Sequence, residues 1–165
     1  MSPKSLNPKI DVLLQTYDQA YNKPAWHGTN LRGSIPGLSF KELLWRPRPK
    51  RHNIWEIAIH CAYWKYAVWR RITGAPKGMF PRVPSDWPKI AAKPDLKQWK
   101  TDLALLEEWH KALRIEIAKF PPSKLGNKPK SSRVSYIKTI YGVSSHDLYH
   151  AGQIQLLKRL QRAND

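Results

Sequence analysis

The 165-residue chain contains a single cysteine, Cys61, and therefore cannot form an internal disulfide. A lone thiol is typical of proteins that work in a reducing cytoplasm rather than of small secreted domains. The chain also lacks any run of about 18 uncharged apolar residues, the length that a membrane-spanning helix needs. Its first residues, from Met1 to Pro8, lack the apolar segment of a signal peptide. We therefore expect a soluble, cytoplasmic protein.

Acidic residues are scarce, with 12 Asp and Glu against 29 Lys and Arg, which gives a formal net charge of +17. Such an excess is common in proteins that bind nucleic acid, because neutralising phosphates drives that binding. The basic residues are spread along the chain, however, and no nucleic-acid recognition motif surrounds their concentrations at 46–51, 124–133 and 158–162. A solvated basic surface is the preferred interpretation, and a nucleic-acid site is the alternative.

Strand-like alternation and internal repeats are missing as well. Apolar residues make up 41% of the chain and include eight tryptophans, a composition that excludes a disordered protein. These residues recur at helical spacing in four long segments, so each segment has one apolar face to bury. A length of 165 residues suits one domain with a sizeable core. The sequence predicts a single all-α domain over residues 1–165.

Residues that start or stop helices delimit these segments. Pro8 fits the first position of a helix, where its missing N–H is not needed, and Pro24 ends that helix. Asn53 and Glu56, three residues apart, form the pattern of a capping box. The predicted long helices cover residues 8–23, 54–73, 95–120 and 134–162, and a short helix covers 40–45. The glycine- and proline-rich stretch 26–37 is predicted to be a loop.

The connection between the second and third long helices is unusually long. Residues 74–94 include five prolines, which forbid a continuous helix there. Antiparallel neighbours need only a few connecting residues, whereas a long crossover returns the chain so that two successive helices run parallel. We predict a four-helix bundle with one long crossover between helices two and three.

Two histidines four residues apart, His146 and His150, project from one face of the predicted last helix. Both imidazoles can then reach one metal ion at about 2.0–2.1 Å. Both also fall on the apolar face, where an unpaired imidazole is costly to bury. His60, on the edge of the apolar face of the second helix, is the best third ligand. The alternative is that all three are core histidines without a metal.

Three imidazoles form an incomplete ligand shell that leaves positions for water or substrate, as in catalytic metal sites. They suit zinc, nickel, copper and iron alike. Asp147 and Glu56 are candidate carboxylates that orient an imidazole through its second N–H. Alternatively, Asp147 faces solvent and Glu56 only caps its helix. Trp64 and Gln153, each about one turn from a histidine, are candidate pocket residues.

Four further residues are predicted to lie outside this site. His27 lies in a loop, and closure of that loop over the site is its alternative role. His52 precedes the cap of the second helix, and His110 lies among charged residues of the third. Cys61 is predicted to be a small core residue.

The stretch from Trp55 to His60, followed by an aromatic-rich helix, and the run from His146 to Ile154 resemble the DinB-like family of metalloenzymes. Residues 26–28, 38–39 and 46–47 also resemble the sequences of members of that family. The resemblance spans nearly the whole chain, and its most specific part is the histidine–aspartate–x–x–histidine–alanine–glycine–glutamine run. It implies a four-helix bundle of up-down-down-up topology. It also implies a metal triad of one histidine on the second helix and two on the fourth, which correspond to His60, His146 and His150.

Relatives of known activity in that family include thiol-dependent transferases and isomerases that use bacillithiol, mycothiol or glutathione, and many members form dimers. The resemblance therefore implies a divalent metal ion, zinc or nickel first. We expect a metal-dependent hydrolase or thiol-dependent transferase that acts on a small molecule, such as a low-molecular-weight thiol, and a homodimer. Two alternatives stay open: a nucleic-acid-binding protein with a basic surface, and a metal-binding bundle without catalytic activity.

Overall fold

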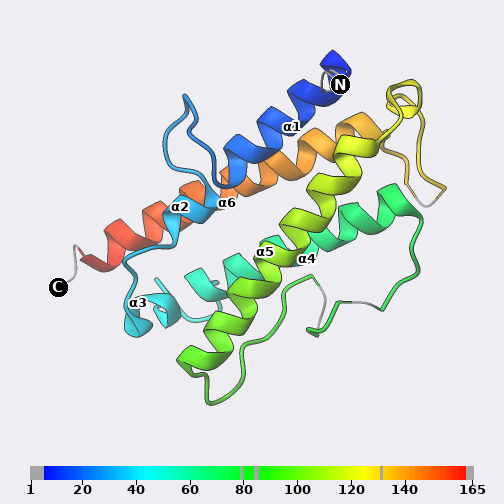
Figure 1. Cartoon of the computed structure of the whole chain (residues 1–165). Coiled ribbons are helices and arrows are strands. Elements are labelled where there is room, and N and C mark those ends of the chain that lie inside the picture. Colours follow the sequence, from blue (N-terminus) through cyan, green and yellow to red (C-terminus); the bar gives the residue numbers. More distant parts are fainter. Residues whose placement is uncertain (1–5, 79, 84–85, 131, 163–165) are drawn as a thin grey trace.

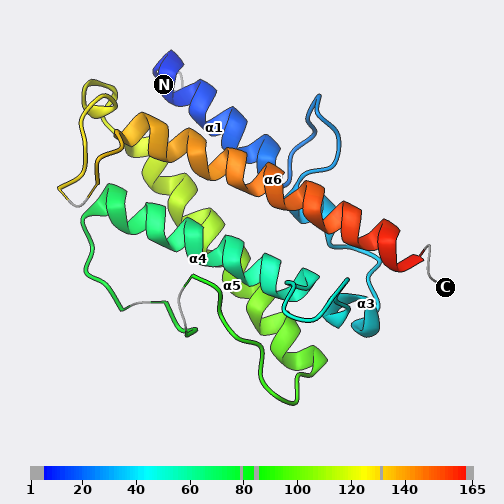
Figure 2. The ribbon, with the colours of Figure 1, turned by 180° about the vertical axis from the view of Figure 1, so that it is seen from behind.

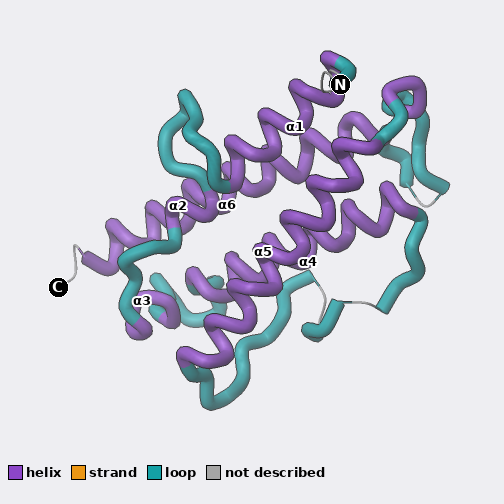
Figure 3. The backbone as a smooth tube through the Cα atoms, in the orientation of Figure 1, coloured by secondary structure: helices purple, strands orange, loops and turns teal. Residues whose placement is uncertain are grey.

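The computed structural model describes residues 6–78, 80–83, 86–130 and 132–162 (Figure 1). Helices separated by loops make up these residues, and no strand occurs among them (Figure 3). The all-α prediction is confirmed. Within the described ranges, no helix has the length and apolar character needed to cross a membrane. The predicted domain limits, residues 1 and 165, lie outside the described residues.

The helices begin and end where local sequence signals place them. In chain order they are α1 (Pro8–Tyr21), α2 (Leu31–Ser34), α3 (Phe40–Leu44), α4 (Ile54–Thr73), α5 (Leu96–Lys119), the 3-10 helix η1 (Pro122–Lys124) and α6 (Tyr136–Arg162). Pro8 occupies the start of α1, and Asn53 with Glu56 closes the N-terminus of α4 as a reciprocal capping box. Gly74, in the left-handed region at φ 76°, ends α4.

The four long helices pack around a common core. Helix α4 packs along α5 and α6, and α1 packs against α6 and α5. In Figures 1 and 2, α1 and α6 lie side by side and run in one direction, whereas α4 and α5 run in the other. The segment between α4 and α5 returns along the outside of the bundle (Figure 1). This arrangement brings the middle of α4 opposite the middle of α6.

Two short helical elements, α2 and η1, were not predicted. Helix α2 lies within residues 26–37, whose glycine and proline content predicts a loop. The Asn30 side chain accepts a hydrogen bond from the Gly33 N–H at 2.8 Å, and Leu31 is fully buried. A helix of one turn presents no periodic apolar face, and its cap, the buried Leu31 and Ser34, and a hydrogen bond from the Lys158 ammonium to the Ser34 carbonyl stabilise it instead. That is why the pattern of apolar residues missed it.

Candidate metal centre

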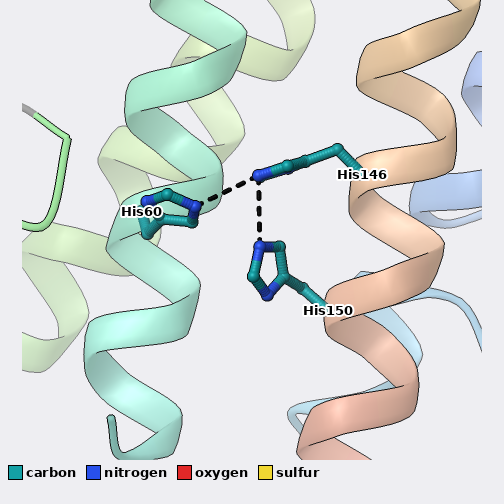
Figure 4. A group of neighbouring side chains, drawn as sticks. All are labelled: His60, His146 and His150. Atoms are coloured by element: carbon teal, nitrogen blue, oxygen red, sulfur yellow. Dashed lines mark hydrogen bonds between the residues drawn. The ribbon is translucent and has the colours of Figure 1, made fainter.

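Helices α4 and α6 bring three histidines together in the middle of the bundle. His60 comes from α4 and His146 and His150 from α6, and their rings point toward one another (Figure 4). The Nε2 atom of His146 lies 3.1 Å from Nε2 of His60 and 3.1 Å from Nε2 of His150. Ligands about 2.0–2.1 Å from a tetrahedral ion lie about 3.3 Å apart. The three side chains therefore form a group that could hold one metal ion.

Hydrogen bonds from the Nδ1 atoms of His60 and His150 fix which nitrogen of each ring faces the centre of the triad. Nδ1 of His60 lies 2.6 Å from the backbone oxygen of Asp86, and Nδ1 of His150 lies 2.7 Å from Oε1 of Gln153. Both oxygens can only accept, so each Nδ1 donates its proton and each neutral ring presents the Nε2 lone pair to the centre. A proton on His146 Nε2 can satisfy only one of these two lone pairs. A metal ion would use all three nitrogens.

Burial keeps these imidazoles in the neutral form. Desolvation lowers the pKa of His60, lowers that of His150 to about 4, and lowers that of His146 to about 3. For His146, the neighbouring imidazoles lower the pKa further. Because a metal ion binds neutral imidazole, no protonation competes with binding near neutral pH.

The comparison with known families agrees with this geometry. The family model of the DinB superfamily matches residues 25–154, which include all three histidines. The chain belongs to the DinB superfamily. No curated protein and no solved structure gives a significant match. The resemblance inferred from the histidine motif is therefore confirmed.

Two of the predicted pocket residues lie beside the triad of this DinB-superfamily protein. Gln153 accepts the hydrogen bond from His150 described above. The Trp64 ring lies 6.3 Å from that of His60 and 5.9 Å from that of His146, measured between ring centres. Its Nε1–H donates to Asp86 Oδ1 at 2.9 Å. Trp64 and Gln153 thus bound the site on two sides.

Trp87 is part of the site and was not predicted. Its ring stacks on His60 with ring centres 3.7 Å apart and on His52 with centres 3.6 Å apart, both nearly parallel. Trp87 follows Asp86, whose carbonyl orients His60, so one short piece of the α4–α5 connection both covers and orients that ring. In the sequence, the role of Trp87 is indicated only by the presence of an aromatic residue in the proline-rich connection. The histidines on which it stacks lie on other segments of the chain.

Glu56 does not reach the imidazoles. Its carboxylate binds the Arg46 guanidinium through two contacts of 2.6 Å and lies 3.2 Å from Nδ1 of His52. Among the described residues, no hydrogen bond joins it to the triad. Glu56 is in the first turn of α4, where the capping box holds its side chain toward the preceding segment. Glu56 therefore caps α4, as the alternative interpretation held, and does not orient an imidazole.

Asp147 neither faces solvent nor binds an imidazole. It is fully buried and forms an ion pair with Lys65 of α4, which is also fully buried. The Lys65 ammonium lies 4.7 Å from the ring centres of both Tyr17 and Tyr21 of α1. Burial raises the pKa of Asp147 to about 6, although Lys65 works in the opposite direction. The pair thus links α4, α6 and α1 behind the metal-binding group.

Cys61 is a core residue, as expected. It is fully buried, and burial raises the pKa of its thiol, which keeps it unreactive. Its sulfur, His146 and Asp147 also have ligand atoms within 4.8 Å of one another. Because the Lys65 ammonium already compensates the Asp147 charge, this second group suits an ion pair better than another cation.

The other histidines are not members of the triad, although His52 lines the pocket that reaches His150. His27 and His52 are exposed, and His52 stacks on the outer face of Trp87. His110 is buried, contrary to the expectation of a charged surface position, and stacks on Tyr17 and Tyr21. None of them joins the triad group.

Pockets adjoin the triad on two sides. A pocket of about 560 Å³ reaches His150 and Gln153, and its other walls come from α4, α6, the segment before α4 and Trp87 of the α4–α5 connection. A smaller pocket of about 240 Å³ reaches His146 and is lined by Trp64, Arg71 and Lys138 among others. Small molecules could therefore approach the three nitrogens from two directions.

Proposed function

We propose that this DinB-superfamily protein binds one divalent metal ion, zinc or nickel, through Nε2 of His60, His146 and His150. We further propose that it is a metal-dependent enzyme, either a thiol-dependent transferase or a hydrolase. The observation that carries the proposal is the convergence of three neutral imidazole nitrogens, two of them with their Nδ1 protons donated elsewhere, beside a pocket of about 560 Å³.

The residues around the triad suit a catalytic rather than a closed structural site. Three protein ligands leave a coordination position for an external group, whereas structural zinc sites use four. When bound, such an ion supplies Lewis acidity that lowers the pKa of a coordinated water or thiol toward neutrality. The Asp86 carbonyl and Gln153 hold two rings in the required tautomer, and Trp87 and Trp64 restrict ring motion and exclude water from part of the site.

Transfer from a thiol is favoured over hydrolysis because two pockets, rather than one, adjoin the triad. A thiol in one pocket and an electrophile in the other would lie on either side of it. The thiolate sulfur would then form a bond to the electrophilic carbon, the leaving group would depart with its electron pair, and the thiol proton would pass to solvent. Lys138 and Arg71, which line the smaller pocket, suit an anionic low-molecular-weight thiol.

We also propose that the bundle has the up-down-down-up topology of its family. The directions of α1, α4, α5 and α6 in Figures 1 and 2 support this, as does the long connection between α4 and α5.

The test is an equilibrium titration with zinc and nickel, followed by an assay of chloride release from a chloroaromatic electrophile in the presence of a small thiol. The parent should bind metal tightly and release chloride only when loaded, and His60→Ala and His150→Ala should lose both properties while keeping helical circular dichroism. A metal-loaded parent that neither releases chloride in the presence of the thiol nor hydrolyses an ester would support the non-catalytic metal-binding bundle. Salt-sensitive binding of duplex DNA without any metal binding would support the nucleic-acid alternative.

A further inference from the structure

The larger pocket beside the triad indicates a class of substrate. We propose that it binds a small amphipathic carboxylate, a molecule with an apolar chain or ring and one carboxylate. The proposal rests on the proposed function, because it places the reacting end of that molecule at the three histidines.

One wall of this pocket is apolar. Leu156, Leu157 and Leu160 of α6 lie on it, with Ile57 of α4 on the buried side. Since an α-helix rises 1.5 Å per residue, Leu160 lies about 15 Å along α6 from His150. Leu156 is 57% exposed. This wall is therefore long enough, and accessible enough, to contact an extended apolar chain that starts at the triad.

The exposed side of the same pocket carries positive charge. Arg48 and Arg51 line it, and both come from the segment before α4. A turn holds the two close in the chain, because the Arg51 N–H donates to the Arg48 carbonyl oxygen at 3.2 Å and Lys50 between them has φ 65°. Arg46, in contrast, lies outside the lining of this pocket and is paired with Glu56.

Neither arginine of the pocket has an acidic partner within the described part of the chain, whereas Arg46, Arg82, Arg114 and Arg162 each form an ion pair. Two uncompensated guanidinium groups that line the same pocket as an apolar wall complement a ligand that is apolar along its length and anionic at one end. A carboxylate suits them because guanidinium groups bind carboxylates through paired hydrogen bonds.

Two other occupants suit the pocket less well. A nucleic-acid backbone would need basic groups along its whole length, but here, among the described residues of the pocket, only Arg48 and Arg51 bring guanidinium or ammonium groups to a mainly apolar lining. A second copy of the chain could cover Leu156 and the exposed Tyr149, but it would not explain why the pocket continues to His150 and Gln153. Both occupants give distinct outcomes in the test below.

The experiment is isothermal titration of the metal-free protein, kept in EDTA at low salt, with sodium octanoate and with octan-1-ol. The test variant is R48Q/R51Q. The matched control is K128Q/K130Q, which removes the same charge from the exposed loop before α6, at the other end of the bundle (Figure 1). We expect the parent and the control to bind octanoate alike and the test variant to bind it on the order of tenfold more weakly. Octan-1-ol should bind the parent and the test variant equally.

The proposal is overturned if octanoate binds the parent and R48Q/R51Q equally, or if neither binds it with or without zinc. It is also overturned if the parent is a dimer in sedimentation and the dimer fails to bind octanoate, since a second copy then covers the wall. Zinc titration of the same samples keeps the two proposals apart. Zinc binding without octanoate binding contradicts only the substrate class, and octanoate binding without zinc binding contradicts only the metal site.

Discussion

Lowering the pH from 7.5 to 5.0 should destabilise the folded protein by about 2 kcal/mol through one side chain, the imidazole of His110. His110 is 4% exposed and stacks on Tyr21 and Tyr17, with ring centres 3.8 and 4.5 Å away. Its Nδ1 has no hydrogen-bond partner among the described residues. The same two tyrosine rings already face the Lys65 ammonium, so a second positive charge would be both desolvated and repelled.

The magnitude follows from the pKa. Burial first, and then the charge of Lys65, lower the pKa of His110 to about 2. In the unfolded chain the pKa of a histidine is about 6.5. Between these values the unfolded chain binds a proton that the folded protein does not, so stability present above about pH 6.5 is lost as the pH falls. At pH 5.0 the difference from the unfolded pKa is about 1.5 units, and about 1.36 kcal/mol per unit gives about 2 kcal/mol.

The assay is urea unfolding of the metal-free protein at pH 7.5 and 5.0, compared between the parent and His110→Phe. The triad imidazoles contribute equally to both proteins and cancel in the difference. The free energy of unfolding should fall by about 2 kcal/mol more in the parent than in the variant. The control is His27→Gln, which changes an exposed imidazole that stays in water in both states and should leave the parent's pH dependence unaltered. Equal pH dependence of the parent and His110→Phe would refute the reasoning.

Two further substitutions test the neighbours of the triad. Gln153→Leu removes the acceptor that orients His150 and should weaken zinc binding about 10–100-fold in a competition titration, whereas Gln155→Leu, on the same helix, should not change it. An equal affinity for both variants would mean that the hydrogen bond does not orient the ring. Lys65→Met leaves the buried Asp147 carboxylate without its partner and should lower the free energy of unfolding by about 3–5 kcal/mol. Asp147→Asn added to Lys65→Met should recover part of this loss, and a simple sum of the two single effects would contradict a coupled pair.

Much of the helical framework could be predicted because its signals act locally. The capping box of Asn53 and Glu56 satisfies the first N–H groups of α4 wherever that helix packs, and Pro8 starts α1 for a similar reason. The spacing of His146 and His150 likewise guarantees a shared face once α6 forms. Their contact with His60 depends instead on how α4 and α6 pack, which no local pattern encodes.

The remaining features depend on contacts between distant segments. Lys65 and Asp147 are 82 residues apart, and a buried lysine is rare enough that no local pattern predicts it. Asp86 and Trp87 lie in a connection whose course over α4 is set by tertiary packing, and their roles follow only from their contacts with His60. The sequence allows the Glu56 carboxylate either to orient an imidazole or to cap α4. Its position in the first turn of α4 leads to the capping role.

The metal content of the protein, purified without an affinity tag, tests the central claim most directly. Elemental analysis of the parent beside the His146→Ala variant should find about one divalent ion per chain in the parent and almost none in the variant, with both folded. His146 is the decisive position because its Nε2 lies 3.1 Å from both of the other Nε2 atoms. A folded parent that contains no metal, and takes up neither zinc nor nickel on incubation, would contradict the claim and leave the three histidines as core residues.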